Sequence, residues 1–306
     1  MPNTSLTDQQ IASYRADGYL VIENFLTPAE LATWRERVDA AVAKRTGKTP
    51  GQLAGNKLFD SDPDGFVEGR PNAADLEDNS QGSPSYYASV FTQTLQLWMD
   101  DAPMAELMVS PAIGKMAAEL AGVQGIRIWH DQALIKEPWA NPTGWHLDNP
   151  YWSFDDSHGP HGGTLSLWVA LDDATPENGC MHFVRGSHRH TEYRRNAGIG
   201  RNLGELFERY PEWQGRAEME PVAVPMRAGA ASFHSGMTAH GAGANMTAGR
   251  RRAMTCGYMP DGATFNGNPN VLPPDYVATL AIGDVLDNDA LNPLLWRGAG
   301  GEGPRL

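Results

Sequence analysis

The sequence predicts a mainly β fold with flanking helices, in which an antiparallel sandwich or jelly roll forms the core. After Gly125 the chain breaks into short apolar runs separated by turn residues, at intervals that suit antiparallel strands. Before that residue, apolar side chains recur at helical spacing in several segments. Glycine and proline are frequent, with 33 and 22 residues, which is typical of a chain with many turns.

Residues 1–122 are predicted to be mostly helical. The stretch 6–45 has two helical patterns around a short apolar run, which predicts a helix, a strand and a second helix. Thr7 and Thr27 stand where N-caps belong. Gly18 is expected to end the first helix, because glycine readily adopts the left-handed backbone conformation found there.

Two further segments complete this N-terminal part. Residues 51–85 are rich in Gly, Pro, Asp and Asn and lack either period, which predicts a long irregular surface segment. Such a segment is either a lid over a site or a plain solvated loop. Residues 86–122 return to helical spacing in pieces separated by Pro103 and Pro111, and we expect them to form a helical layer.

Residues 123–290 are predicted to form the jelly-roll core. Within it, 188–219 is expected to be an insertion between strands that carries a short helix. The glycine-rich end of the chain, 297–306, is predicted to be a flexible tail. No internal repeat and no change in composition marks a second domain, so we expect 1–306 to form a single domain.

The composition limits the kinds of partner. A formal net charge of −13 disfavours binding to nucleic acid or to an anionic membrane, because both require a positive field. No apolar run approaches about 20 residues, and the N-terminus lacks the apolar segment of a signal peptide. Cys180 and Cys256 are too few for a disulfide framework. We therefore expect a soluble, cytoplasmic protein with a small-molecule partner, and no feature of the sequence indicates its oligomeric state.

A possible metal site stands in the stretch GWHLDNPYW, residues 144–152. In a strand, residues i and i+2 point to the same face, so His146 and Asp148 can present an imidazole and a carboxylate to one point. Many non-heme oxygenases hold iron(II) with two histidines and one carboxylate, which leaves the opposite face of the metal open. The pair is a weak signal by itself, and a third ligand must come from elsewhere in the chain.

The stretch 233–260 offers that ligand: a histidine is followed by a glycine-rich turn with an asparagine, and then by arginines that open a new strand. Four blocks, GYLVIENFLTPAEL, WHLDNPYW, LWVALDDATPENGCMHFVRGSH and HGAGAN followed by arginine, together resemble the phytanoyl-CoA dioxygenase family of iron(II)- and 2-oxoglutarate-dependent oxygenases. The blocks cover most of the chain in the family's order. The resemblance implies a cupin-like double-stranded β-helix core that uses Fe(II), 2-oxoglutarate and O2.

The resemblance also implies roles for single residues. The implied iron ligands are His146, Asp148 and His240. The family's arginine, eleven residues beyond the distal histidine, falls on Arg251. Strand alternation points Arg251 to the face opposite to Arg250 and Arg252, so either Arg251 alone or the other two look into the barrel. One buried guanidinium that forks onto the distal carboxylate of 2-oxoglutarate is the more economical arrangement.

The stretch TLSLWVALDD predicts a strand with two unlike faces. One face is entirely aliphatic and should pack against the helices: Leu165, Leu167, Val169 and Leu171. The mixed face, with Thr164, Ser166 and Trp168, should line the barrel. The resemblance places Ser166 and Trp168 near 2-oxoglutarate, and a purely structural role for Trp168 is an equally good interpretation.

Other positions at the barrel mouth are candidates for binding. Gln132 is a candidate for the cofactor or the substrate, and Trp129, Tyr151 and Trp152 are candidates for substrate contacts. Each aromatic side chain has the alternative of packing in the core. Where many relatives carry a hydroxyl side chain two residues after the distal histidine, this chain has Ala242. The corresponding hydrogen bond to 2-oxoglutarate is then absent or supplied by another group.

The expected function is the hydroxylation of an unactivated C–H bond of a small molecule, with formation of succinate and CO2. Asp148 argues against a halogenase, in which chloride takes the place of the carboxylate, whereas desaturation, ring formation and epimerisation stay open. The acidic composition disfavours a coenzyme A thioester as substrate. One alternative is a cupin-like metal-dependent isomerase or binding protein without 2-oxoglutarate. Another is an inactive relative, which the retention of all three ligands disfavours.

Overall fold

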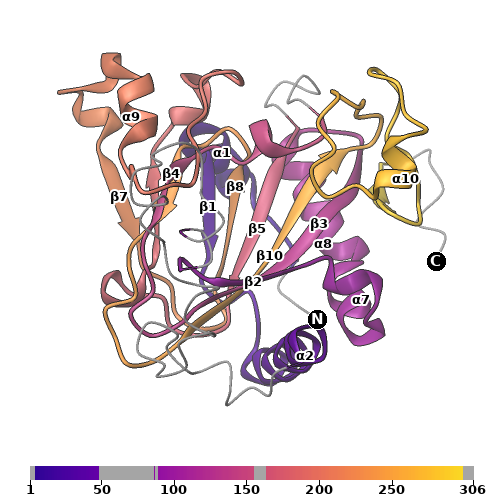
Figure 1. Cartoon of the computed structure of the whole chain (residues 1–306), viewed down its shortest axis with the longest axis horizontal. Helices are drawn as coiled ribbons and strands as arrows, with labels where there is room; N and C mark the ends of the chain where they lie inside the picture. The colour runs from indigo at the N-terminus through magenta and orange to yellow at the C-terminus, as the bar shows by residue number, and fades with distance from the viewer. Residues whose placement is uncertain (1–3, 48–85, 87–88, 155–162, 299–306) are drawn as a thin grey trace.

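The structure is a computed structural model, and it describes residues 4–47, 86, 89–154 and 163–298. Within these residues two antiparallel sheets face each other. The larger sheet lies between the smaller sheet and the helices α7 (Ala102–Met108) and α8 (Pro111–Ala121), as Figure 1 shows. This is the predicted jelly-roll core in its double-stranded β-helix form. The predicted lid-like segment 51–85 lies outside the described residues.

The larger sheet has antiparallel pairing throughout. Its strands, in spatial order, are β1 (Tyr19–Ile22), β8 (Ala231–Ser235), β5 (Leu165–Ala170), β10 (Arg251–Pro260), β3 (Gly125–Lys136) and β11 (Leu294–Arg297), and β2 (Thr92–Leu95) also pairs with β3. The smaller sheet has the order β4 (Thr143–His146), β9 (His240–Ala242), β6 (Met181–Val184) and β7 (Pro221–Val224).

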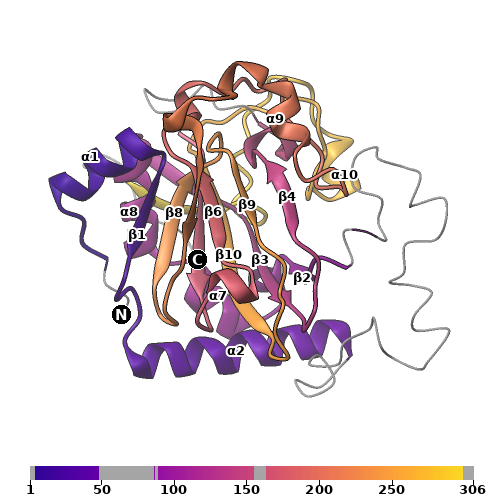
Figure 2. The same cartoon turned by 90° about the vertical axis from the view of Figure 1, so that its left-hand side faces the viewer.

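The two N-terminal helices, α1 (Asp8–Asp17) and α2 (Pro28–Thr46), begin and end where the sequence predicts. Each starts with a capping box, in which the side chain of Thr7 or Thr27 accepts a hydrogen bond from a backbone N–H three residues later. Gly18 ends α1 with a left-handed φ of 80°. Figure 2 shows α2 across one end of the two sheets, with α9 (Glu205–Arg209) at the opposite end.

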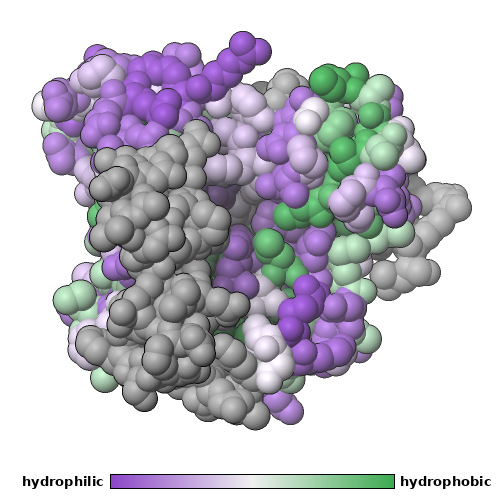
Figure 3. Space-filling model, in the orientation of Figure 1, coloured by the Kyte–Doolittle hydropathy of each residue, from purple (hydrophilic) through white to green (hydrophobic). Residues whose placement is uncertain are grey.

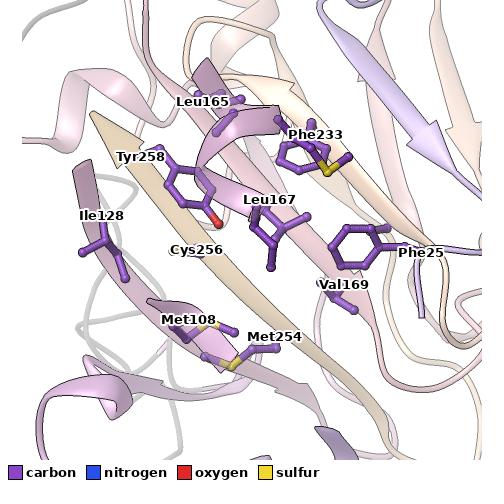
Figure 4. Packing of buried hydrophobic residues seen from close by; sticks show 14 of the residues in the cluster. Phe25, Met108, Ile128, Leu165, Leu167, Val169, Phe233, Met254, Cys256 and Tyr258 are labelled. Atoms are coloured by element: carbon purple, nitrogen blue, oxygen red, sulfur yellow. The ribbon is translucent and has the colours of Figure 1, made fainter. Parts of the chain in front are cut away.

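The main hydrophobic core lies between the larger sheet and the helices. Leu165, Leu167 and Val169 of β5 are buried in it with side chains of the helical layer, such as Met108 (Figure 4). The prediction that the aliphatic face of this strand packs against the helices is confirmed. The opposite face of the larger sheet is thereby left to the space between the two sheets, where β5 presents Ser166.

Two predictions of local structure were wrong. Residues 86–122 were expected to form a helical layer in pieces separated by Pro103 and Pro111, but β2 forms a strand because its alternating threonines suit the open edge that β3 offers between Gln132 and Ile135. The tail was expected to begin at 297, but Arg297 ends β11, pairs with Gly125 and makes an ion pair with Asp261. The core therefore extends beyond residue 290.

The insertion 188–219 connects β6 to β7 and includes α9 and short 3-10 turns. It packs onto the end of the smaller sheet through a second cluster of buried residues, among them Leu147, Leu206 and Trp213. Among the described residues, no helix combines the length and the apolar character needed to cross a membrane.

One buried acid lies on the helical side of the larger sheet. Asp131 of β3 is fully buried, and its Oδ2 accepts a hydrogen bond of 3.2 Å from the backbone N–H of Trp98. No group in the described chain donates to its other oxygen, Oδ1. Burial raises the pKa of Asp131 to about 7, because the ionised form loses its hydration there.

We predict that Asp131→Asn stabilises the protein in a pH-dependent way. Between the unfolded pKa of about 3.9 and the folded pKa of about 7, the native state keeps a proton that the unfolded state releases. The contribution of Asp131 to stability therefore falls as pH rises through this window. Urea unfolding should show the variant more stable by about 1–2 kcal/mol at pH 8, with a smaller difference at pH 5. A difference that is constant with pH would contradict this.

Candidate functional site

Two histidines and one aspartate meet between the sheets at the end of the smaller sheet. His146 is the last residue of β4 and His240 is the first of β9, and the two stand opposite each other in the strand pairing. Asp148 lies beyond the strand, with a helical backbone conformation of φ −76° and ψ −50°. The predicted convergence of His146 and Asp148 therefore occurs, but a turn after β4 produces it rather than strand alternation.

The three side chains present one donor atom each to a common point. Asp148 Oδ1 lies 3.5 Å from His146 Nε2 and 3.4 Å from His240 Nε2. All three donor atoms lie within 4.8 Å of one another. Ligands bound at about 2.1 Å to one ion stand about 3 Å apart when adjacent, so small movements bring these atoms to a metal.

The ring orientations of both histidines suit metal binding. Nδ1 of His146 lies 2.8 Å from the carbonyl oxygen of Gly144, and Nδ1 of His240 lies 2.9 Å from that of Thr238. Because a carbonyl only accepts hydrogen bonds, each Nδ1 carries the proton. Each Nε2 then keeps its lone pair for a metal, as in most metal-bound histidines.

The electrostatics of the site also favour metal binding. Burial raises the pKa of Asp148, but the neighbouring His240, together with His146 and His234, outweighs that effect and holds the pKa well below its usual value. Burial, together with the neighbouring His240, lowers the pKa of His146. An ionised carboxylate and a neutral imidazole are the protonation states that a metal requires.

Sequence reasoning missed one residue of this site. His234 of β8 is buried, and its Nε2 lies 3.2 Å from Asp148 Oδ2. Ser166, expected near 2-oxoglutarate, lines the same cavity and donates a 2.7 Å hydrogen bond to the same oxygen. His234 lies in the stretch 233–260 that the sequence singles out, but no spacing there marks it as part of the site, and the pairing of β8 with β5, which sets His234 opposite Ser166, brings it there.

Arg251 is a buried cation in the same cavity. It opens β10, and its Cζ lies 5.1 Å from the ring centroid of Trp168. Within the described chain, its Nε and Nη1 are buried without a hydrogen-bond partner. Burial lowers the pKa of Arg251 to about 10, so the side chain stays charged at neutral pH. Arg250 and Arg252 face the helices and both pair with Asp39, which confirms the predicted alternation.

A cavity of about 430 Å³ joins these groups. Gln132, Tyr151 and Trp152 line it, as the sequence predicts for residues at the barrel mouth, and so does Ala242. The rest of the described lining is mainly apolar: Phe91, Leu95, Leu134, Met181, Ile199 and Val271 are part of it. Figure 3 shows exposed apolar side chains over the neighbouring segment around α10 (Pro274–Val277), where Ile282 is 76% exposed.

Trp129 does not line the cavity, which corrects the expectation of a substrate contact. In the pairing with β10, His130 stands opposite Gly257 and Ile128 opposite Tyr258, so Trp129 is the additional residue of a β-bulge. Its ring is fully buried and packs edge-on against Phe154. For Trp129 the core-packing alternative is therefore correct.

Ala242 leaves the site without the hydroxyl that many relatives carry at that position. Two threonines line the same cavity: Thr143, which stands opposite Ala242 in the strand pairing, and Thr255 of β10. Gln132 hydrogen-bonds to the side chain of Gln93 from β2, so these two amides form one polar patch on the wall.

Comparison with known sequences agrees with this geometry. The family model described as phytanoyl-CoA dioxygenase (PhyH) matches residues 14–253. A probable phytanoyl-CoA dioxygenase of Caenorhabditis elegans is 23% identical, over 84% of this chain and 76% of the relative. A methylphosphonate hydroxylase of Gimesia maris is 25% identical, over 84% of this chain and 82% of the relative.

Solved structures give the same result. The non-heme alpha-ketoglutarate-dependent carbocyclase SnoK from nogalamycin biosynthesis has a TM-score of 0.68 and 26% identity, over 96% of this chain and 98% of its own. The epimerase SnoN, in complex with Fe3+, alpha-ketoglutarate (2-oxoglutarate) and nogalamycin RO, has a TM-score of 0.61 and 27% identity, over 94% and 98%. The protein belongs to the phytanoyl-CoA dioxygenase family.

Proposed function

We propose that this protein is an iron(II)- and 2-oxoglutarate-dependent oxygenase that hydroxylates a C–H bond of a small molecule. One observation carries the proposal: a cluster of two histidines and a carboxylate shares a cavity with a buried arginine whose Nε and Nη1 have no hydrogen-bond partner in the described chain. The first is the donor set that non-heme iron(II) oxygenases use, and the second is a binding group for a carboxylate.

The chain's residues divide the work of binding. His146, Asp148 and His240 would hold the iron, which their orientation and charge allow. Arg251 would hold the distal carboxylate of 2-oxoglutarate. When bound, iron and 2-oxoglutarate supply the oxidation, with succinate and CO2 as by-products. The protein contributes the positions of the reacting groups and a partly apolar cavity wall that excludes water.

The spacing of side chains along β5 supports this placement of 2-oxoglutarate. Ser166 hydrogen-bonds to Asp148, and Trp168 lies two residues further along the strand, roughly 7 Å from Ser166. The guanidinium of Arg251 reaches the ring of Trp168. This separation is on the length scale of a five-carbon dicarboxylate, and the indole forms one wall beside its expected position.

The remaining cavity wall favours an uncharged substrate group. Asp148 and Arg251 are the only Asp, Glu, Lys or Arg side chains among the described lining residues, and iron and 2-oxoglutarate would engage both. Burial lowers the pKa of His130 in the same wall to about 4, so its ring is neutral. Apolar side chains make up most of the rest. We infer that the part of the substrate that enters is neutral and largely apolar.

Hydroxylation is one of several outcomes within this family. A relative of 25% identity is named a hydroxylase, whereas structural neighbours of 26–27% identity are named a carbocyclase and an epimerase. A metal-dependent isomerase or binding protein without 2-oxoglutarate is the alternative function. The buried, charged Arg251 argues against it, because such a protein has no use for an unpaired cation in its cavity.

We predict that Asp148→Ala reduces succinate release from 2-oxoglutarate at least 100-fold, because it removes one metal ligand. The measurement is succinate formation with iron(II) in a screen of neutral, apolar metabolites, compared with the native protein. Asp275→Ala, which removes an exposed carboxylate of α10, is the control and should keep the native rate. Unchanged succinate release by Asp148→Ala would show that the iron site is wrongly assigned.

We predict that Arg251→Ala weakens 2-oxoglutarate binding on the order of 100-fold, because a charge-assisted, bidentate contact is lost. Anaerobic calorimetric titration of the iron(II)-loaded protein with 2-oxoglutarate measures the dissociation constant. Arg250→Ala is the matched control, since it removes the preceding guanidinium, which faces α2. Equal affinities in all three proteins would show that Arg251 does not hold the carboxylate, and no binding to the native protein would favour the alternative without 2-oxoglutarate.

A further inference from the structure

We propose that His234 and Ser166 are positioning residues that hold Asp148 as a one-oxygen ligand of the metal. This inference rests on the proposed function. The two side chains of the larger sheet hydrogen-bond to Oδ2 of Asp148, so that only Oδ1 is presented to the metal. Neither residue takes part in metal binding itself.

The contacts of the carboxylate are divided between its two oxygens. Oδ2 accepts hydrogen bonds from Ser166 Oγ at 2.7 Å and from His234 Nε2 at 3.2 Å. Oδ1 faces Nε2 of His146 and His240, at 3.5 and 3.4 Å. Two hydrogen bonds to one oxygen of an ionised carboxylate that is only 21% exposed are strong because both are charge-assisted.

The three histidines around Asp148 fall into two classes. His146 and His240 each bond a carbonyl through Nδ1, which fixes the proton there and frees Nε2. His234 has no such contact in the described chain, since its buried Nδ1 lacks a hydrogen-bond partner. An Nδ1 that only needs to accept is cheaper to leave unpaired than a donor, so the proton of His234 belongs on Nε2, where it is donated to Asp148. That Nε2 then has no lone pair for a metal.

The rigidity of the larger sheet makes these donors effective. Ser166 and His234 stand directly opposite each other in the pairing of β5 and β8. Both strands are inner strands of the sheet. Asp148 itself lies in a turn after β4 of the other sheet. The two donors therefore fix the rotation of a carboxylate whose own backbone is outside a strand.

The number of binding positions around a metal gives a reason to hold Asp148 as a one-oxygen ligand. An iron held by one atom each of His146, Asp148 and His240 would keep its remaining positions for 2-oxoglutarate and O2. A carboxylate bound through both oxygens would take one of these positions. Holding Oδ2 away from the metal keeps the site open for both cosubstrates.

The test uses cobalt(II) as a spectroscopic probe of the metal-free protein. We expect the native protein to bind one cobalt(II) per chain. His234→Phe and Ser166→Ala should each weaken cobalt(II) binding 10- to 100-fold, the usual effect of removing a partner of a metal ligand, and change the visible d–d bands of the bound ion. His234→Gln restores an N–H donor and should recover most of the affinity and the native spectrum.

Ser232→Ala is the matched control. Ser232 precedes His234 by two residues in β8 and is equally buried, but in the described chain its hydroxyl has no hydrogen-bond partner. Its removal should leave cobalt(II) affinity and spectrum unchanged. Thermal unfolding of each metal-free variant reports whether it folds, and Ser166→Ala decides the question if His234→Phe does not fold.

The outcomes separate this inference from the proposed function. Native cobalt(II) affinity and native spectra in both His234→Phe and Ser166→Ala would overturn the positioning role while leaving the metal site intact. Equal losses in His234→Phe and His234→Gln would also overturn it, because the N–H donor would then be irrelevant. A native protein that does not bind cobalt(II) would instead refute the metal site of the proposed function.

Discussion

The structure around the site depends on one carboxylate, Asp148, whose side chain is only 21% exposed. An isolated ionised carboxylate in a protein interior costs several kcal/mol unless hydrogen bonds and opposite charges surround it. Asp148 is held from both sheets: its Oδ2 accepts hydrogen bonds from Ser166 and His234 of the larger sheet, and its Oδ1 faces the rings of His146 and His240 of the smaller one. The side chains around Asp148 therefore come together only when the two sheets pack against each other. A shift between the sheets would leave the charge of Asp148 without these neighbours.

Arg251, the buried cation of the cavity, has the opposite surroundings. Asp148 is surrounded by partners, whereas Arg251 keeps two buried guanidinium nitrogens without one in the described chain. The ring of Trp168 beside it offers only a weak compensation. An unpaired buried charge lowers stability, and any anion that binds the folded state alone restores it. Arg251 therefore offers a place for one anion beside the cluster of His146, Asp148 and His240, and much of the remaining described cavity wall is apolar.

Successive side chains on each strand of the larger sheet point to opposite faces, one toward the site and the other toward the core. In β3, His130 and Gln132 face the cavity, while Asp131 between them is buried toward the helices. In β5, Leu165 and Leu167 belong to the core and Ser166 to the site. Side chains one residue apart therefore have unrelated tasks, and substitutions on the core face reach the site only through the backbone.

By itself the sequence determined the features that depend on residues close together along the chain. The alternation in β5 and β10, the capping boxes of α1 and α2 and the ligand set expected from family resemblance follow from local patterns. The tertiary structure decided the rest: the turn that brings Asp148 to His146, the bulge that buries Trp129, the strand β2 on the edge of β3, and the arrival of His234 beside Ser166. The reason is that strand pairing joins residues far apart in sequence, and its register leaves no periodic signal in either partner.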